Sequence, residues 1–252
     1  NLPHPAARSM RGSMIKAIIF DLDDTLFDFK RAHVEGMKAW AAYAEQQFHI
    51  SPDETISEVS ALVKEQAEKI GPLAASHNRV LRAELWLEKH GLPLFPHATV
   101  LAERYWEALI AAAEPTEGAA EVLRDLQMRG FLIGVGTNMT AYVQYKKIEK
   151  LGLGSYIDFI VTSEVCGVDK PIRHFFKYCL KKANEVLERQ GRRERIEINE
   201  ILFIGDSPKH DVEGARNAKM HALLFDPAGR HPEEEERIQS FREISEVLER
   251  LG

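Results

Sequence analysis

The stretch KAIIFDLDDTL, residues 16–26, is the part of the sequence that decides the fold. Its short apolar run ends in three carboxylates, Asp21, Asp23 and Asp24, and such a run is typical of a strand buried on both faces. Ligands of open α/β sheets bind beyond the carboxyl ends of the strands, so we expect Asp21 and Asp23 in an active crevice. Clustered carboxylates repel one another unless a cation compensates, and hard oxygen ligands suit Mg²⁺. Taken alone, the stretch also fits an acidic loop whose Asp caps the next helix.

Length and composition are those of a globular protein. The chain has 252 residues, 44% of them apolar, and a net charge of −6, which argues against a nucleic-acid-binding protein. Its two cysteines, Cys166 and Cys179, form no Cys-x-x-Cys pair, which argues against a zinc ribbon or disulfide framework and fits a reducing cytoplasm. No apolar run reaches the ~18 residues of a membrane helix, so no membrane association is expected. Residues 1–13 lack the apolar centre of a secretory signal, and we interpret them as a cloning remnant before a native start at Met14.

Between about residues 31 and 113 the apolar residues recur at helical spacing. Breaks at Ser51-Pro52, Gly71-Pro72 and Gly91-Leu92-Pro93 divide this region into four amphipathic helices. We expect a small antiparallel bundle inserted after the first strand. The expected buried positions include Val34, Met37, Ala41 and Ala44 in the first helix and Ile56, Val59, Leu62 or Val63, Ala67 and Ile70 in the second.

Strand-like and helix-like segments alternate through the rest of the chain. Predicted strands cover residues 15–20, 131–136, 157–161, 201–205 and 221–225, and predicted helices cover 118–129, 141–150, 174–189, 211–219 and a last segment through 251. This alternation predicts an α/β fold with a doubly wound parallel sheet and right-handed crossovers. The basic run at 189–195 is expected to cover a solvated helix end and loop.

Polar residues follow four of the predicted strands, and in a parallel sheet these positions share one edge. They are Asp21 and Asp23; Thr137 and Asn138; Lys170; and Asp206 and Asp211. Carboxylates, a hydroxyl and an ammonium form a set suited to phosphoryl transfer. Each residue alone could be a helix cap or a loop residue, but their coincidence at four strand ends favours a functional site.

The expected chemistry assigns a role to each group. Asp21 would attack as a carboxylate nucleophile, while Mg²⁺ held by Asp21 and Asp206 would screen its repulsion from an anionic substrate. Thr137 and Lys170 would hold the phosphoryl oxygens. Asp23 would donate a proton to the leaving oxygen and later accept one from water. Asp24 has no catalytic part in this scheme and is expected in a turn or cap.

Four segments together resemble the haloacid dehalogenase-like (HAD) superfamily of hydrolases. They are FDLDDTL at 20–26, VGTN at 135–138, DKP at 169–171 and GDSPKHD at 205–211. The resemblance covers about 14–30 and 115–230 and implies a Rossmann-like sheet of order 5-4-1-2-3 with a helical cap after the first strand. The chain would then divide into a core at 14–30 and 115–252 and a cap at 31–114.

The resemblance also implies the site residues. Asp21 would be the nucleophile and Asp23 the general acid/base. The Mg²⁺ ligands would be the Asp21 carboxylate, the Asp23 backbone carbonyl and Asp206, with Asp211 supporting the metal site. Thr137 and Lys170 would bind the phosphoryl group, and Asn138 is counted with the substrate-binding residues.

The predicted activity is Mg²⁺-dependent hydrolysis of a small phosphorylated metabolite. A haloacid dehalogenase is disfavoured because a halide needs no proton and Asp23 is present. A phosphonate hydrolase would need an activated cap lysine, for which Lys30 and Lys38 are available. A sugar phosphomutase and a non-catalytic binding module remain alternatives. Asp28, Lys30, Arg31 and His33 are candidates for specificity, and the sequence contains no signal for an oligomeric state.

Overall fold

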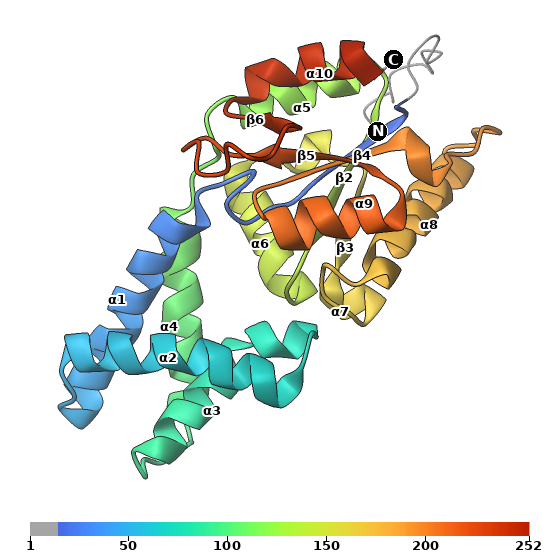
Figure 1. Cartoon of the computed structure of the whole chain (residues 1–252). Coiled ribbons are helices and arrows are strands. Elements are labelled where there is room, and N and C mark those ends of the chain that lie inside the picture. Colours follow the sequence, from blue (N-terminus) through green and yellow to red (C-terminus); the bar gives the residue numbers. More distant parts are fainter. Residues whose placement is uncertain (1–14, 252) are drawn as a thin grey trace.

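Six parallel strands form one sheet in the order β3-β2-β1-β4-β5-β6 (Figure 1). The computed structural model describes residues 15–251, so the prediction for residues 1–13 lies outside the described residues. The strands are β1 (Ala17–Phe20), β2 (Leu132–Thr137), β3 (Phe159–Thr162), β4 (Ile201–Gly205), β5 (His221–Phe225) and β6 (Arg237–Ile238). The predicted order 5-4-1-2-3 is present. The sequence did not predict β6, because two residues beside a polar loop have no strand-like pattern.

Strand β1 lies in the middle of the sheet and is buried on both faces, as its apolar run predicted. Ile18 and Phe20 belong to one hydrophobic cluster, and Ala17 and Ile19 belong to a second on the opposite face. The first cluster contains residues of α5 (Ala119–Met128) and α10 (Ile244–Leu251). The second contains residues of α8 (Arg173–Arg189) and α9 (Gly214–Ala218). The sheet is therefore covered by helices on both sides (Figure 1).

Two short helices lie where the sequence predicted other structure. Helix α7 (Ser163–Cys166) occupies the predicted loop after β3, and its N-cap Thr162 accepts a hydrogen bond from Val165 N. A π-helical turn, η4 (Pro208–Glu213), replaces the start of the helix predicted at 211–219 and leads into α9. Helix α6 (Ala141–Leu151) follows β2 as predicted.

Four helices form the region between β1 and α5. They are α1 (Phe29–Phe48), α2 (Pro52–Ile70), α3 (Arg79–Lys89) and α4 (His97–Ala112), with a 3₁₀ turn, η1 (Ala74–His77), before α3. Helices α1 and α4 run side by side, and α2 lies across them rather than alongside (Figure 1). Gly36 on α1 allows this close approach, because a Cβ there would lie 2.8 Å from the ring of Tyr105 on α4. The start of α2 is the predicted one: the Ser51 side chain accepts from Glu54 N, and Pro52 occupies the first turn.

The buried faces of these helices differ from the expected ones at several positions. Val34 is 50% exposed and Ala67 is exposed, so both predictions of burial were wrong. In α2 the buried stripe ends at Gln66. In α3 it contains two arginines, Arg79 and Arg82. The spacing of apolar residues did not indicate that Gln66, Arg79 and Arg82 are buried, because these side chains are polar.

Two further sequence predictions concern the surface. The basic run at 189–195 lies at the exposed end of α8 and in the loop that follows, as predicted. Among the helices at 15–251, none is long and apolar enough to cross a membrane.

Candidate active site

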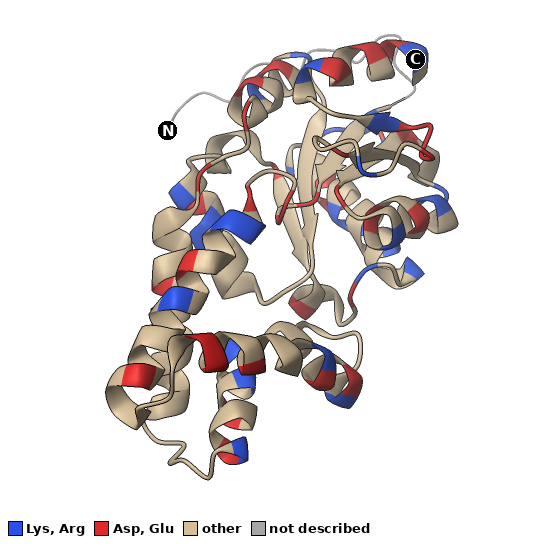
Figure 2. Cartoon of the chain, turned by 60° about the vertical axis from the view of Figure 1, so that its left-hand side comes forward, with Lys and Arg blue, Asp and Glu red and all other residues tan. Residues whose placement is uncertain are grey.

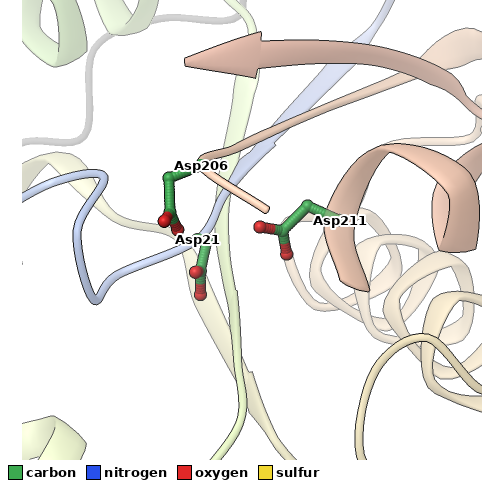
Figure 3. Close-up of side chains that lie close together, drawn as sticks. All are labelled: Asp21, Asp206 and Asp211. Carbon is green, nitrogen blue, oxygen red and sulfur yellow. The ribbon is translucent and has the colours of Figure 1, made fainter. Parts of the chain in front are cut away.

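Three carboxylates from two strand ends and one turn converge at the edge of the sheet. Asp21 follows β1, Asp206 follows β4, and Asp211 lies in η4. One oxygen from each lies within 4.8 Å of the other two, and the three side chains lie close together (Figure 3). Acidic positions also gather on the loops beside the central strands, whereas the outer helices mix both signs of charge (Figure 2).

Lys170 joins two of these carboxylates. Its Nζ lies 2.7 Å from Asp21 Oδ1 and 2.7 Å from Asp211 Oδ1, and it donates to the Gly136 carbonyl at 3.1 Å. Although burial alone lowers the pKa of Lys170, the Asp21 and Asp211 carboxylates raise it above its ordinary value. Lys170 is therefore a fixed positive charge at the centre of the site.

One ammonium does not balance three carboxylates. Burial raises the pKa of Asp21 well above its ordinary value, and the charges of Asp211 and Asp206 add to this effect against Lys170. Burial, Asp211 and Asp24 together raise the pKa of Asp206 to about 7. This excess of negative charge and the all-oxygen donor set fit a divalent cation.

The available oxygens indicate which carboxylates would hold that cation. Asp211 uses both oxygens within the chain, since Oδ1 bonds Lys170 and Oδ2 accepts from Ser207 N at 2.9 Å. The Asp206 side chain forms no hydrogen bond or ion pair with any residue at 15–251. Asp21 and Asp206 can therefore bind the cation directly, while Asp211 orients Lys170 and the loop after β4.

The position of Asp211 depends on the glycine before Asp206. A Cβ on Gly205 would lie 2.4 Å from Asp211 Cγ and 2.4 Å from Asp211 Oδ2. Only a residue without a side chain allows Asp211 to pack against the end of β4.

Asp23 lies outside the carboxylate cluster. Its Oδ1 is 2.7 Å from Lys147 Nζ, and its Oδ2 accepts from Gln144 Nε2 at 3.3 Å. Lys147 is completely buried, and burial lowers its pKa while the Asp23 carboxylate opposes this shift. The structure thus places Asp21 and Asp23, two residues apart, in different electrostatic environments.

Thr137 is the last residue of β2 and Asn138 follows it, and together they link both parts of the site. Gln144 Nε2 donates to Thr137 Oγ1 at 2.6 Å, and Asn138 Oδ1 accepts from Lys170 N at 2.9 Å. The Asn138 side chain thus fixes the backbone of the Lys170 loop. Gln144 and Lys147 were missed by the sequence analysis. Their spacing of three residues on α6, next to apolar Val143 and Ile148, was the available signal for a buried polar face.

The segment between β1 and α1 contains the other candidates. Asp24 has a left-handed backbone, with φ of 59°, and its side chain accepts from Lys30 N at 3.0 Å, so it has the expected turn role. Lys30 and Lys38 are exposed and pair with Asp24 and Glu35. Neither lysine has the desolvated setting that activates an amine as a nucleophile.

A cleft of 620 Å³ opens beside Asp206. Asp24, Asp28, Lys30 and Arg31 line it from the β1–α1 segment, and Arg230 lines it from the loop after β5. Three of the four specificity candidates therefore lie in this cleft. The fourth, His33, lies instead among the helices between β1 and α5, where its Nδ1 is 2.6 Å from Tyr105 Oη.

The helical region contacts the core next to Lys170. His77 Nε2 lies 2.9 Å from Asp169 Oδ2, and Asp169 N donates to the Pro72 carbonyl at 2.9 Å. The residue that precedes Lys170 thus binds both ends of the segment between α2 and α3.

Comparison with known proteins is consistent with this architecture. The chain is 29% identical over 243 residues to a ribulose-1,5-bisphosphate 5-phosphatase of Halopiger xanaduensis, covering 95% of this chain and 97% of the relative. It is 29% identical to a glyceraldehyde 3-phosphate phosphatase of Pyrococcus abyssi, covering 84% of this chain and 82% of the relative.

Among solved structures, the HAD-hydrolase YfnB of Bacillus subtilis, bound to magnesium, has a TM-score of 0.72 at 22% identity and covers 93% of this chain and 99% of its own. A 2-haloacid dehalogenase of Pseudomonas syringae also has a TM-score of 0.72, at 23% identity, with coverage of 94% and 100%. These two likenesses support the fold. The family model for haloacid dehalogenase-like hydrolases matches residues 15–219. The chain therefore belongs to the haloacid dehalogenase-like hydrolase family.

Proposed function

We propose that the protein is a Mg²⁺-dependent phosphatase that hydrolyses a small phosphomonoester through an aspartyl-phosphate. The observation that supports this most is the separation of the two carboxylates after β1. Asp21 lies in the acidic cluster beside Lys170, and Asp23 is held apart by Lys147. A nucleophile and a proton carrier need such different surroundings. Relatives named as phosphatases of small sugar phosphates give the proposal independent support.

In the proposed reaction an Asp21 oxygen attacks phosphorus, and the bond to the ester oxygen breaks. Asp23 donates a proton to the leaving oxygen, so the alcohol departs neutral. Asp23 then accepts a proton from a water molecule that attacks the aspartyl-phosphate, which releases inorganic phosphate and restores Asp21. Lys170 and the Thr137 hydroxyl bind the phosphoryl oxygens and stabilise the charge that develops on them.

Mg²⁺, held by Asp21, Asp206 and the Asp23 carbonyl, would neutralise part of the negative charge on nucleophile and substrate. The charge excess of the three carboxylates supports this assignment. Asp211 would act by orienting Lys170. We also propose that residues 31–114 form a cap that closes over a core made of 14–30 and 115–252. Closure of such a cap excludes bulk water from the site, apart from the molecule that hydrolyses the aspartyl-phosphate.

A cytoplasmic location is proposed as well. Cys166 and Cys179 are both free and buried, as expected in a reducing compartment. Cell fractionation followed by detection of the chain tests this, and recovery from an oxidising compartment would contradict it.

The proposed activity is tested by phosphate release from 4-nitrophenyl phosphate with Mg²⁺ and with EDTA. We expect turnover with Mg²⁺, its loss in EDTA, and its loss in a folded Asp21→Asn variant. Turnover that persists in Asp21→Asn contradicts the mechanism. Isomerisation of a sugar phosphate without phosphate release would indicate a mutase instead.

A further inference from the structure

Four cationic side chains are almost completely buried among the described residues, and they fall into two classes. Lys147 and Lys170 each lie 2.7 Å from a carboxylate oxygen. Arg79 and Arg82, which are 6% and 4% exposed, form no ion pair with a carboxylate anywhere in the described part of the chain. Burying a guanidinium without a counter-charge is costly, so this pair requires an explanation.

The partners of both arginines are neutral. Arg79 donates to the His77 carbonyl at 2.8 Å and to Tyr105 Oη at 3.0 Å. Arg82 donates to Gln66 Oε1 at 2.8 Å and lies 3.4 Å from the Ser76 carbonyl. These contacts orient the two side chains but leave two positive charges uncompensated.

One donor of Arg79 has no partner. Its Nε is buried and forms no hydrogen bond with any described residue. Its guanidinium lies over the rings of Tyr105 and Trp106, at 4.6 Å and 5.0 Å from their centroids. The aromatic faces hold the guanidinium in place, while Nε remains a buried donor without a partner among the described residues.

The surroundings show the effect of the positive charge. Burial lowers the pKa of Arg82 to about 9, and the neighbouring Arg79 adds to this effect. Burial and the same two arginines lower the pKa of His33 to about 4, so His33 is neutral at pH 7 and adds no charge. This part of the cap therefore attracts an anion.

One aromatic ring separates Arg79 from Lys147, the partner of the proposed general acid. The centroid of the Trp106 ring lies 5.0 Å from Arg79 Cζ and 5.4 Å from Lys147 Nζ. Lys147 in turn forms the ion pair with Asp23. The leaving oxygen must reach Asp23 to receive its proton. The part of the substrate that departs with this oxygen would therefore lie on the cap side of Asp23, toward Arg79.

We propose that Arg79 and Arg82 form a binding site in the cap for a second anionic group of the substrate, a phosphate or a carboxylate distinct from the phosphoryl group that is hydrolysed. This inference rests on the proposed function and narrows the substrate class to bisphosphates and phosphorylated acids. Bidentate recognition by a guanidinium suits both groups. Both arginines are buried among residues of the helical region itself, so these helices must shift relative to one another to admit the ligand.

The test compares matched substrates. One pair is a pentose 1,5-bisphosphate and the pentose 5-phosphate, and the other is 3-phosphoglycerate and glycerol 3-phosphate. A site built for a charged group rejects an analogue that lacks it. In one of the two pairs we therefore expect kcat/KM to be about 100-fold higher for the substrate that has a second anionic group. The substrate pair with the larger ratio of kcat/KM values shows whether the site prefers a phosphate or a carboxylate as the second group.

Arg79→Gln should reduce that ratio to near one, and Arg104→Gln, which removes an exposed arginine of α4, should leave it unchanged. A wild-type ratio near one for both pairs overturns the inference. Equal loss of activity on all four substrates in Arg79→Gln also overturns it, because that result indicates a structural role.

A binding experiment separates this inference from the proposed function. In the Asp21→Asn variant, the pentose bisphosphate should raise Tm more than the monophosphate, and adding Arg79→Gln should remove the difference. If wild type hydrolyses no phosphomonoester, the proposed function fails while this difference can still appear. If wild type hydrolyses 4-nitrophenyl phosphate but neither ratio nor Tm difference appears, only the arginine site fails.

Discussion

Lys147 Nζ lies 2.7 Å from Asp23 Oδ1 and is completely buried, although Lys147 belongs to α6 and to none of the four family segments. The ion pair holds the carboxylate of Asp23 away from the cluster formed by Asp21, Asp206 and Asp211. Gln144, one turn earlier on α6, binds both Asp23 and Thr137. Helix α6 thus orients the proposed acid and a phosphate-binding hydroxyl together.

Lys147→Met is expected to lower kcat by about 100-fold, within the range attributed to general acid–base groups, because Asp23 loses the partner that orients it. The exposed neighbour Lys146, which pairs with Glu149, provides the control substitution Lys146→Met. Steady-state kinetics with 4-nitrophenyl phosphate and circular dichroism measure activity and folding. A folded Lys147→Met enzyme with wild-type kcat contradicts the assignment.

The cation-free protein should lose stability as the pH rises. The pKa of Asp206 is raised from 3.8 to about 7, so between these values the folded state binds more protons than the unfolded state. The stabilisation from this group is therefore complete below about pH 4 and is lost as the pH rises through about 7. The pKa of Asp21 is raised too and acts in the same direction.

Mg²⁺ competes with these protons, so its effect on Tm should be small at pH 5 and large at pH 8. Thermal unfolding with Mg²⁺ and with EDTA across this range measures both trends. Asp206→Asn should weaken the dependence on pH and on Mg²⁺. An equal Mg²⁺ effect at pH 5 and pH 8 would count against the cation site.

Gly205→Ala should reduce both stability and activity. The new Cβ would overlap Asp211, which must then release Lys170 or shift the end of β4. Overpacking of this kind costs about 1–3 kcal/mol, and displacement of Lys170 should lower kcat further. Gly154→Ala is the matched control, because its Cβ would meet its nearest neighbour at 3.8 Å. Denaturant unfolding and kinetics on both variants decide whether the effect is specific to position 205.

The contact between His77 and Asp169 should control the cap. His77→Ala removes the 2.9 Å contact and is expected to speed hydrogen exchange at 71–78 and raise KM. Asp169→Asn is the second single variant of a double-mutant cycle. The effect of both substitutions together on KM, expressed as a free energy, should be smaller than the sum of the two single effects. Full additivity would show that the two side chains act independently.

The parts of the fold that the sequence predicted are those with continuous apolar runs. Strands β1, β2 and β4 are buried along their length, so their ends and the polar residues there were identifiable. The charged residues buried in helices were not. Lysine and arginine ordinarily face water, and only tertiary packing buries Lys147, Arg79 and Arg82.

The different surroundings of Asp21 and Asp23 also could not be predicted in detail. Strand β1 ends at Phe20, and the turn that follows directs Asp23 toward α6 rather than toward β4. The direction depends on where α6 lies in space. The short strand β6 and helix α7 were missed because their length gives no periodic pattern.

Asp169 binds the segment between α2 and α3, and the next residue along the chain is Lys170, whose ammonium contacts Asp21. One peptide bond therefore connects the position of the cap to the cation that would hold the phosphoryl group. Thermodynamic linkage makes such a connection reciprocal: if cap closure favours phosphoryl binding by some factor, phosphoryl binding favours closure by the same factor. A phosphate analogue that occupies only the core would then shift the cap equilibrium without touching the cap helices.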